Sequence, residues 1–208
     1  MMKAFLATLT LLLFPLTGTS AQDLPNYGDA AAAYSLQNYA AAASIWRRLA
    51  DEGDARAGYH LAMLAEQGLG TERDPGEARR LYQQAAGAGN MAAAARLGAM
   101  LLAGGNPEAA RQWLEKAAEA GIARAQYGLA AILLRARGDK RDLIGAWCWL
   151  DKAARGFADE TNRRAALHSR DLVAAAMNER QRQALHSGRS ASDTEAAAKA
   201  DMAKTGGG

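Results

Sequence analysis

The sequence predicts an all-α fold: a right-handed α-α solenoid of about four helix–turn–helix repeats, closed by a C-terminal pair of capping helices. Three observations predict it. Apolar residues recur with the spacing of an α-helix, and separate sequence features return in one phase every 32 to 36 residues. The same stretch holds no alternating pattern of apolar and polar residues that would favour a β-strand.

The first repeating feature is a pair of small or apolar residues followed by a glycine. It occurs four times, with the glycines 36, 32 and 35 residues apart, at Gly53, Gly89, Gly121 and Gly156. Glycine adopts the left-handed backbone conformation that ends many helices at little steric cost. Each of these glycines is therefore predicted to stand just after a helix, in the left-handed conformation.

The second and third features mark the interiors of paired helices. An alanine and a leucine four residues apart follow the first three glycines, with the leucines at Leu61, Leu97 and Leu129. Farther on, an alanine precedes a large side chain by three residues, at Leu81, Trp113 and Trp149. Both spacings keep the side chains on one face of a helix. Small alanines let two helices approach, and the large side chains are expected to fill the gaps between neighbours.

The start of each second helix is marked by a polar residue in the same phase. Asp74, Asn106 and Asp142 precede the helical pattern, and Pro75 and Pro107 follow the first two. Asp and Asn accept hydrogen bonds from the free N–H groups of a first helical turn, and proline is well tolerated at the first helical position. These residues are predicted to be N-caps.

The unit that runs from the Ala57–Leu61 pair through Gly68-Leu69-Gly70 and Asp74 to Gly89 resembles the Sel-one-like repeat. This repeat is a relative of the tetratricopeptide repeat and is built from two antiparallel helices. The resemblance covers roughly residues 29–156, with units at about 29–53, 54–89, 90–121 and 122–156. It implies a non-enzymatic protein-binding scaffold or regulatory adaptor of the bacterial cell envelope, which holds a protein partner along a concave groove and needs no cofactor.

The N-terminal residues predict export. Lys3 precedes an apolar stretch over 4–16, and Thr19-Ser20-Ala21 offers the small residues of a cleavage site. We therefore expect a signal peptide over 1–21. A permanent anchor is the alternative, but 13 apolar residues are fewer than the roughly 20 that span a bilayer. The expected location of the solenoid, residues 22–186, is the periplasm, with secretion as the alternative.

The C-terminal part is predicted to cap the stack. Residues 160–177 fit one helix, with packing residues expected at Ala165, Leu167, Leu172 and Ala176. Asn178 and Gln181 have the spacing of a capping box that opens a last short helix, so that 157–186 form the cap. Residues 187–208 are rich in Ser, Ala, Gly and balanced charge, a composition that is typical of disorder.

The sequence carries no recognisable set of catalytic residues. His60, His168 and His186 lie far apart, and no metal-ligand spacing or phosphate-binding loop is present. The formal net charge of +3 is not gathered into a basic tract, which argues against nucleic acid. The alternative functions are polysaccharide or peptidoglycan binding and, with less support, peptidoglycan hydrolysis. The lone Cys148 is either a buried small hydrophobe or a reactive thiol, and the sequence does not indicate the oligomeric state.

The predicted partner-binding residues lie on the first helices of the second and fourth units. Arg56 and Tyr59 are 68 residues before Arg124 and Tyr127, and Met63 follows on the same side. An arginine beside a tyrosine can hold a carboxylate or a carbonyl while the ring packs on the ligand. The alternative is that each tyrosine packs against the next unit, and the sequence leaves both possibilities open.

Overall fold

The structure, a computed structural model, describes residues 24–135 and 142–187 of the chain. The predicted signal peptide and, from residue 188 on, the predicted tail lie outside these residues. The described part consists of α-helices joined by short turns, and it contains no strand. The helices are α1 (Tyr27–Ser35), α2 (Tyr39–Asp51), α3 (Ala55–Gln67), α4 (Pro75–Gly87), α5 (Met91–Ala103), α6 (Pro107–Glu119), α7 (Ala123–Arg135), α8 (Leu143–Gly156), α9 (Glu160–Ala176) and α10 (Glu179–His186).

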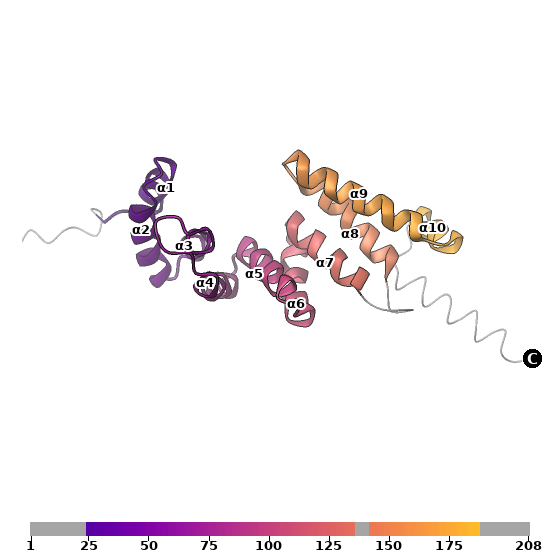
Figure 1. The fold of residues 1–208 in the computed structure, drawn as a ribbon, viewed down its shortest axis with the longest axis horizontal. Coiled ribbons are helices and arrows are strands. Elements are labelled where there is room, and N and C mark those ends of the chain that lie inside the picture. The colour runs from indigo at the N-terminus through magenta and orange to yellow at the C-terminus, as the bar shows by residue number, and fades with distance from the viewer. Residues whose placement is uncertain (1–23, 136–141, 188–208) are drawn as a thin grey trace, which may run out of the picture.

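The helices form successive pairs that stack along one curved path (Figure 1). Within the repeats, α1 packs on α2, α3 on α4, α5 on α6 and α7 on α8. The second helix of each pair then packs on the first helix of the next, as α4 does on α5 and α6 does on α7. This arrangement is an α-α solenoid, so the predicted fold class is confirmed. None of the described helices is both long and apolar enough to cross a membrane.

The predicted caps of the second helices are present. The side chains of Asp74, Asn106 and Asp142 accept hydrogen bonds from backbone N–H groups in the first turns of α4, α6 and α8. The first helices α3 and α5 also have side-chain caps, Asp54 and Asn90, which the sequence analysis did not identify. Both ends of most turns are thus fixed by local hydrogen bonds, and this sets the angle at which each pair of helices meets.

Three of the four predicted turn glycines are confirmed. Gly53, Gly89 and Gly121 have φ values of 94°, 91° and 85°. The prediction for Gly156 is wrong, because Gly156 is the last residue of α8 and the chain continues in extended conformation at Phe157. A Cβ atom at Gly156 would lie 3.1 Å from the Cβ of Ala123. Glycine is used here to let the end of α8 approach the start of α7.

The core follows the predicted leucines and alanines. Leu61, Leu97 and Leu129 are buried, and so is Leu81. Trp113 and Trp149 are half-buried and pack against the core, and the following Leu114 and Leu150 are buried within it. The buried side of α6 and α8 is therefore centred on these leucines, with the tryptophans at its edge. The two indole rings lie under ammonium groups, with the Nζ of Lys116 5.6 Å and that of Lys152 4.4 Å from the ring centroids.

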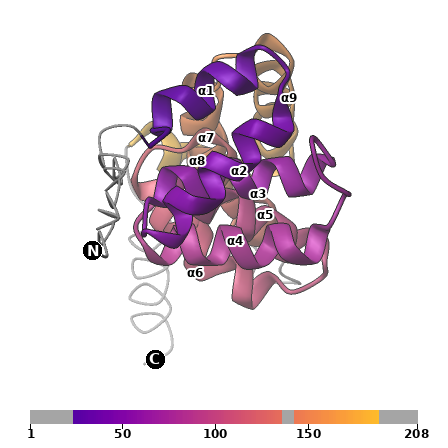
Figure 2. The same ribbon diagram turned by 90° about the vertical axis from the view of Figure 1, so that its left-hand side faces the viewer.

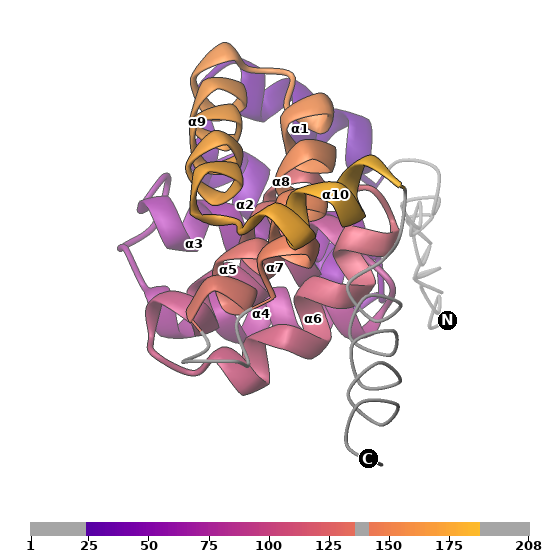
Figure 3. The same ribbon diagram turned by 90° about the vertical axis from the view of Figure 1, so that its right-hand side faces the viewer.

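The C-terminal helices cover the end of the stack (Figure 3), where α9 packs along α8. The capping box of Asn178 and Gln181 is confirmed at the start of α10. Of the four packing residues predicted on α9, Leu167 is half-buried and packs beside Ala153 and Ala154 of α8. The prediction is wrong for the other three, since Leu172 is 59% exposed and Ala165 and Ala176 are exposed as well. The buried residues are instead Ala166, Val173 and Met177, each one position later.

Candidate partner-binding surface

Two successive first helices of the repeats, α5 and α7, pack directly together, whereas no two of α2, α4, α6 and α8 pack to a comparable extent. A stack of helix pairs curves toward the side on which its helices are closest. The packing of α5 on α7 therefore assigns these first helices to the inner side of the curve. Figure 2 shows the stack from its α1 end.

The open face of these helices is given by their periodicity. In α3, α5 and α7, the residues at the second, ninth and thirteenth positions of each helix lie on one side. They do so because nearly whole helical turns separate them. All of them are half-buried or exposed. We call this surface the first-helix face; it consists of Arg56, Met63, Gln67, Ala92, Ala99, Ala103, Arg124, Ala131 and Arg135.

At the α3 end of the face, Arg56 projects from the surface. Its side chain is 68% exposed, and its Nη2 lies 3.3 Å from a carboxylate oxygen of Asp54. The guanidinium carbon also stands 4.5 Å from the centre of the Tyr27 ring. Tyr59, beside Arg56, is half-buried between the rings of His60 and Tyr82, at centroid distances of 5.1 and 5.8 Å. The Tyr59 ring is therefore held by packing within its own neighbourhood.

A polar network lies next to Tyr59. The hydroxyl of Tyr82 donates a hydrogen bond of 2.7 Å to Glu66, and Arg96 lies 3.7 Å from the same carboxylate. Burial, together with the bond to Glu66, raises the pKa of Tyr82 far above its ordinary value, so the phenol remains a donor. Glu66 thus neutralises Arg96 and joins α3, α4 and α5. No periodic pattern indicates this network, because its residues occupy unrelated positions in different helices.

At the α7 end, Arg124 and Tyr127 line a pocket of about 220 Å³ together with Phe157, Asn162 and Ala165. The hydroxyl of Tyr127 lies 3.2 Å from that of Ser169 in α9. Tyr127 is half-buried and packs at the joint between the last repeat and the cap, while Arg124 is exposed. The pocket is therefore formed by a repeat and the capping helix together, which the sequence pattern of the repeats alone could not indicate.

The two predicted arginine–tyrosine pairs occupy equivalent positions two units apart, but their surroundings differ. Arg56 is partly neutralised by Asp54, and both tyrosines contact neighbouring helices. On α5, between the two pairs, the equivalent positions are occupied by Ala92 and Ala95, and Ala95 is buried. Met63 is half-buried on α3. The role of all five predicted residues in binding stays a prediction.

Cys148 is half-buried in α8, so it lies between the two alternatives of a buried small hydrophobe and a reactive thiol. Burial raises the pKa of its thiol, although the nearby Lys152 opposes the shift. Less of the thiol is ionised at neutral pH than in water, which lowers its reactivity. Among the residues that the structure describes, no three His, Cys, Asp or Glu side chains are grouped so that they could hold a metal ion.

Known proteins resemble this chain in its repeats. Residues 55–90, 92–122 and 123–156 match the Sel1 repeat, and α1 and α2 lie outside the matched residues. The mouse (Mus musculus) DAP3-binding cell death enhancer 1 is 48% identical over 48 residues, which are 23% of this chain and 9% of that protein. The chain thus spans only a small part of this relative.

Two solved structures have a similar fold. A protective antigen present in uropathogenic Escherichia coli strains, which displays an SLR fold, is similar with a TM-score of 0.60 and 28% sequence identity. The similarity covers 81% of this chain and 43% of the antigen. A Sel1 repeat protein from Oxalobacter formigenes has a TM-score of 0.54 and 23% identity over 73% of this chain and 72% of that chain, which supports the fold. Residues 55–156 of this solenoid are thus three Sel1-like repeats.

Proposed function

We propose that this protein is a scaffold or regulatory adaptor of the bacterial cell envelope, and that it binds a protein partner along the first-helix face. The Sel1 repeat fold typically mediates protein–protein interaction, which agrees with a scaffold. The observation that carries the choice of surface is the direct packing of α5 on α7. It joins the open positions of α5 and α7 into one continuous surface, and α3 carries the equivalent positions one repeat earlier.

The composition of the first-helix face supports binding in place of a purely structural role. Arg56, Arg124 and Arg135 are exposed, although ordinary packing of the repeats does not require charged side chains there. Alanines occupy the face on α5, so a partner's backbone can approach this helix closely. A long surface of this type can contact an extended segment at several points, as helical repeat proteins do.

Photocrosslinking in intact cells tests this proposal. A photoreactive residue in place of Ala99, at the centre of the first-helix face, should give a covalent adduct with a protein. The same residue in place of Gln83, which is exposed on the second helix α4, should give little adduct. Equal adducts at the two positions would contradict the proposed surface, and recovery of a glycan at Ala99 would favour polysaccharide binding.

The proposed location rests on the N-terminal residue pattern and has its own test. If the chain is exported and processed, the protein isolated from the periplasm should begin at Gln22 when its N-terminus is sequenced. Secretion would place the same processed chain in the medium. An unprocessed chain that begins at Met1 and remains in the cytoplasm would contradict the envelope proposal.

A further inference from the structure

Charge is distributed unequally between the first and second helices of the repeats. Helices α3, α5 and α7 carry four arginines, Arg56, Arg96, Arg124 and Arg135, and a single carboxylate, Glu66. Helices α5 and α7 contain no Asp or Glu at all. The second helices α4 and α6 together carry four carboxylates, which are balanced by four cationic side chains; these are Glu77, Glu108, Glu115 and Glu119, and Arg79, Arg80, Arg111 and Lys116. The net positive charge of these repeats therefore lies on the first helices.

The two arginines of α7 are the ones left available for a ligand. Arg56 and Arg96 already lie beside Asp54 and Glu66. Within the described residues, Arg124 and Arg135 form no ion pair, and the Nη1 of Arg135 donates one long hydrogen bond, of 3.5 Å, to the Leu102 carbonyl of α5. Asp159 is close enough to sense the charge of Arg124, but its carboxylate accepts two hydrogen bonds of 2.8 Å from Asn162.

The spacing of these arginines suggests what they bind. Eleven residues separate them on α7, which is about 16 Å along the helix axis. Apolar side chains lie between them, at Tyr127, Ala131 and Leu134, beside the pocket near α9. An extended chain covers this distance in about five residues. Carboxylates roughly four or six positions apart share one side of such a chain, so both can reach an arginine.

We propose that the first-helix face binds an extended acidic protein segment, whose carboxylates meet Arg124 and Arg135 and whose intervening apolar side chain lies against Tyr127 and Ala131. This proposal rests on the proposed function and adds the chemistry of the partner. Charge-assisted bonds from guanidinium groups to carboxylates are strong enough to select such a segment over a neutral one. A basic segment is disfavoured by the lack of acidic residues on α5 and α7.

Selection from a random-peptide library with the whole protein as bait tests the proposal. Enriched peptides should carry Asp or Glu on both sides of an apolar residue. The affinity of one such peptide, measured by fluorescence anisotropy, should fall about tenfold or more in the double variant Arg124→Gln/Arg135→Gln. The matched double variant Arg79→Gln/Arg111→Gln, on the second helices α4 and α6, should change it by less than about twofold.

Several results would overturn the proposal. These are an empty selection, enriched peptides without carboxylates, or equal binding by the two double variants. If neutral peptides are enriched and lose affinity in Ala99→Trp, the face binds a partner but the acidic chemistry is wrong. If they bind Ala99→Trp normally, the proposed function fails too. Binding to phosphatidylglycerol vesicles that depends on Arg124 and Arg135, without enrichment of acidic peptides, would assign the face to a membrane surface instead.

Discussion

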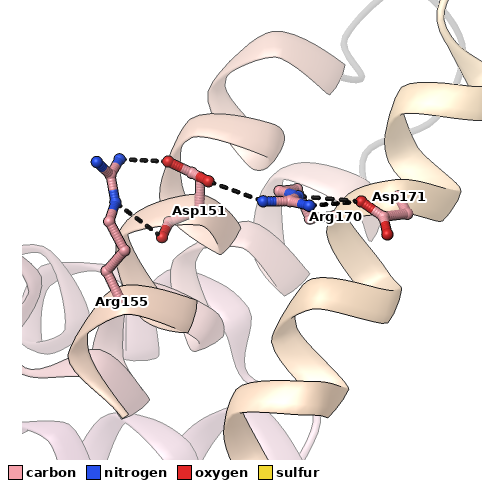
Figure 4. Close-up of polar contacts among 4 residues, drawn as sticks. All are labelled: Asp151, Arg155, Arg170 and Asp171. Atoms are coloured by element: carbon pink, nitrogen blue, oxygen red, sulfur yellow. Dashed lines mark hydrogen bonds and ion pairs between the residues drawn. The ribbon is translucent and has the colours of Figure 1, made fainter.

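The two ends of the solenoid are held together by different interactions. At the α1 end, the Trp46 side chain is buried, stacks on the His60 ring at a centroid distance of 4.7 Å, and has the rings of Tyr27 and Tyr34 at 6.4 and 5.7 Å. At the other end, α8 and α9 are joined by a line of charges that runs from Arg155 through Asp151 and Arg170 to Asp171 (Figure 4).

The two ends of one stack are thus stabilised by different kinds of contact. The aromatic cluster removes apolar area from water and depends little on salt, whereas the charges of α8 and α9 are partly exposed and can be screened. Asp151 and Arg170 retain 19% and 26% of their side-chain surface, and Arg170 also lies over the Trp147 ring at 5.8 Å. We therefore expect the α1 end to respond to loss of packing and to pH, and the α9 end to salt.

The largest effect is expected at the aromatic cluster. Trp46→Ala should lower the free energy of unfolding by about 3–5 kcal/mol, because the cavity would be surrounded by rings that cannot close it. The half-buried Trp149 of α8 is the matched control, and Trp149→Ala should cost clearly less. Chemical denaturation of both variants measures the two losses. Equal losses would show that Trp46 is no more central than Trp149.

The next largest loss of stability is expected in the middle of the stack, which also serves as a reference for both ends. A Cβ atom at Gly98 would lie 2.6 Å from the Leu114 side chain, which is fully buried, so Gly98→Ala should cost about 1–3 kcal/mol. At Gly58, the equivalent atom would be 3.4 Å from the Ala85 Cβ. Gly58→Ala should be nearly neutral, because the gain in helix propensity offsets the closer contact. Thermal denaturation compares the two, and an equally stable Gly98→Ala variant would disprove this close approach.

The charges of α8 and α9 should contribute less. Arg170→Ala should cost about 1 kcal/mol, since exposed pairs contribute little and this one is partly buried. Moderate salt should reduce the difference between the original protein and the variant, whereas the loss caused by Trp46→Ala should not change. Arg163, which pairs with Glu160 on the exposed surface of α9, is the control. A salt-independent loss at Arg170 would mean that its packing on Trp147 matters more than its charge.

A small pH effect is expected at the α1 end. Burial lowers the pKa of His60 below 6.5, although Asp54 opposes the shift, and the ring Nδ1 is buried without a hydrogen-bond partner. As the pH falls below about 6.5, His60 is protonated in the unfolded chain before it is protonated in the folded protein. The free energy of unfolding therefore decreases with falling pH. This loss should be absent in His60→Gln and retained in the control His168→Gln, in which an exposed histidine is replaced. An unchanged pH profile in His60→Gln would contradict the assignment.

Local signals allowed much of the fold to be predicted. The caps at Asp74, Asn106 and Asp142 and the turns at Gly53, Gly89 and Gly121 depend on hydrogen bonds and backbone conformation within a few residues. Such features can be identified from sequence because each residue type has one dominant local role. Because these signals recur with one period, they also predicted which helices form pairs.

The remaining features depend on the angle at which helices stack. In α6 and α8 the buried face is centred on Leu114 and Leu150, with the tryptophans at its edge, and in α9 Val173 is buried in place of the predicted Leu172. The pocket beside Tyr127 and the network of Glu66, Tyr82 and Arg96 join residues from three elements each. Helical periodicity is too coarse to fix a face to within one residue, and it gives no information on contacts between distant helices.

The central claim, that a protein partner occupies the first-helix face, is tested most directly by NMR of alanine methyl groups. The signals of Ala92, Ala99 and Ala131 should shift or broaden when the partner recovered by crosslinking is added. Those of Ala88 and Ala109, at the end of α4 and the start of α6, should stay unchanged. Shifts confined to Ala88 and Ala109 would place the partner on the second helices and contradict the account.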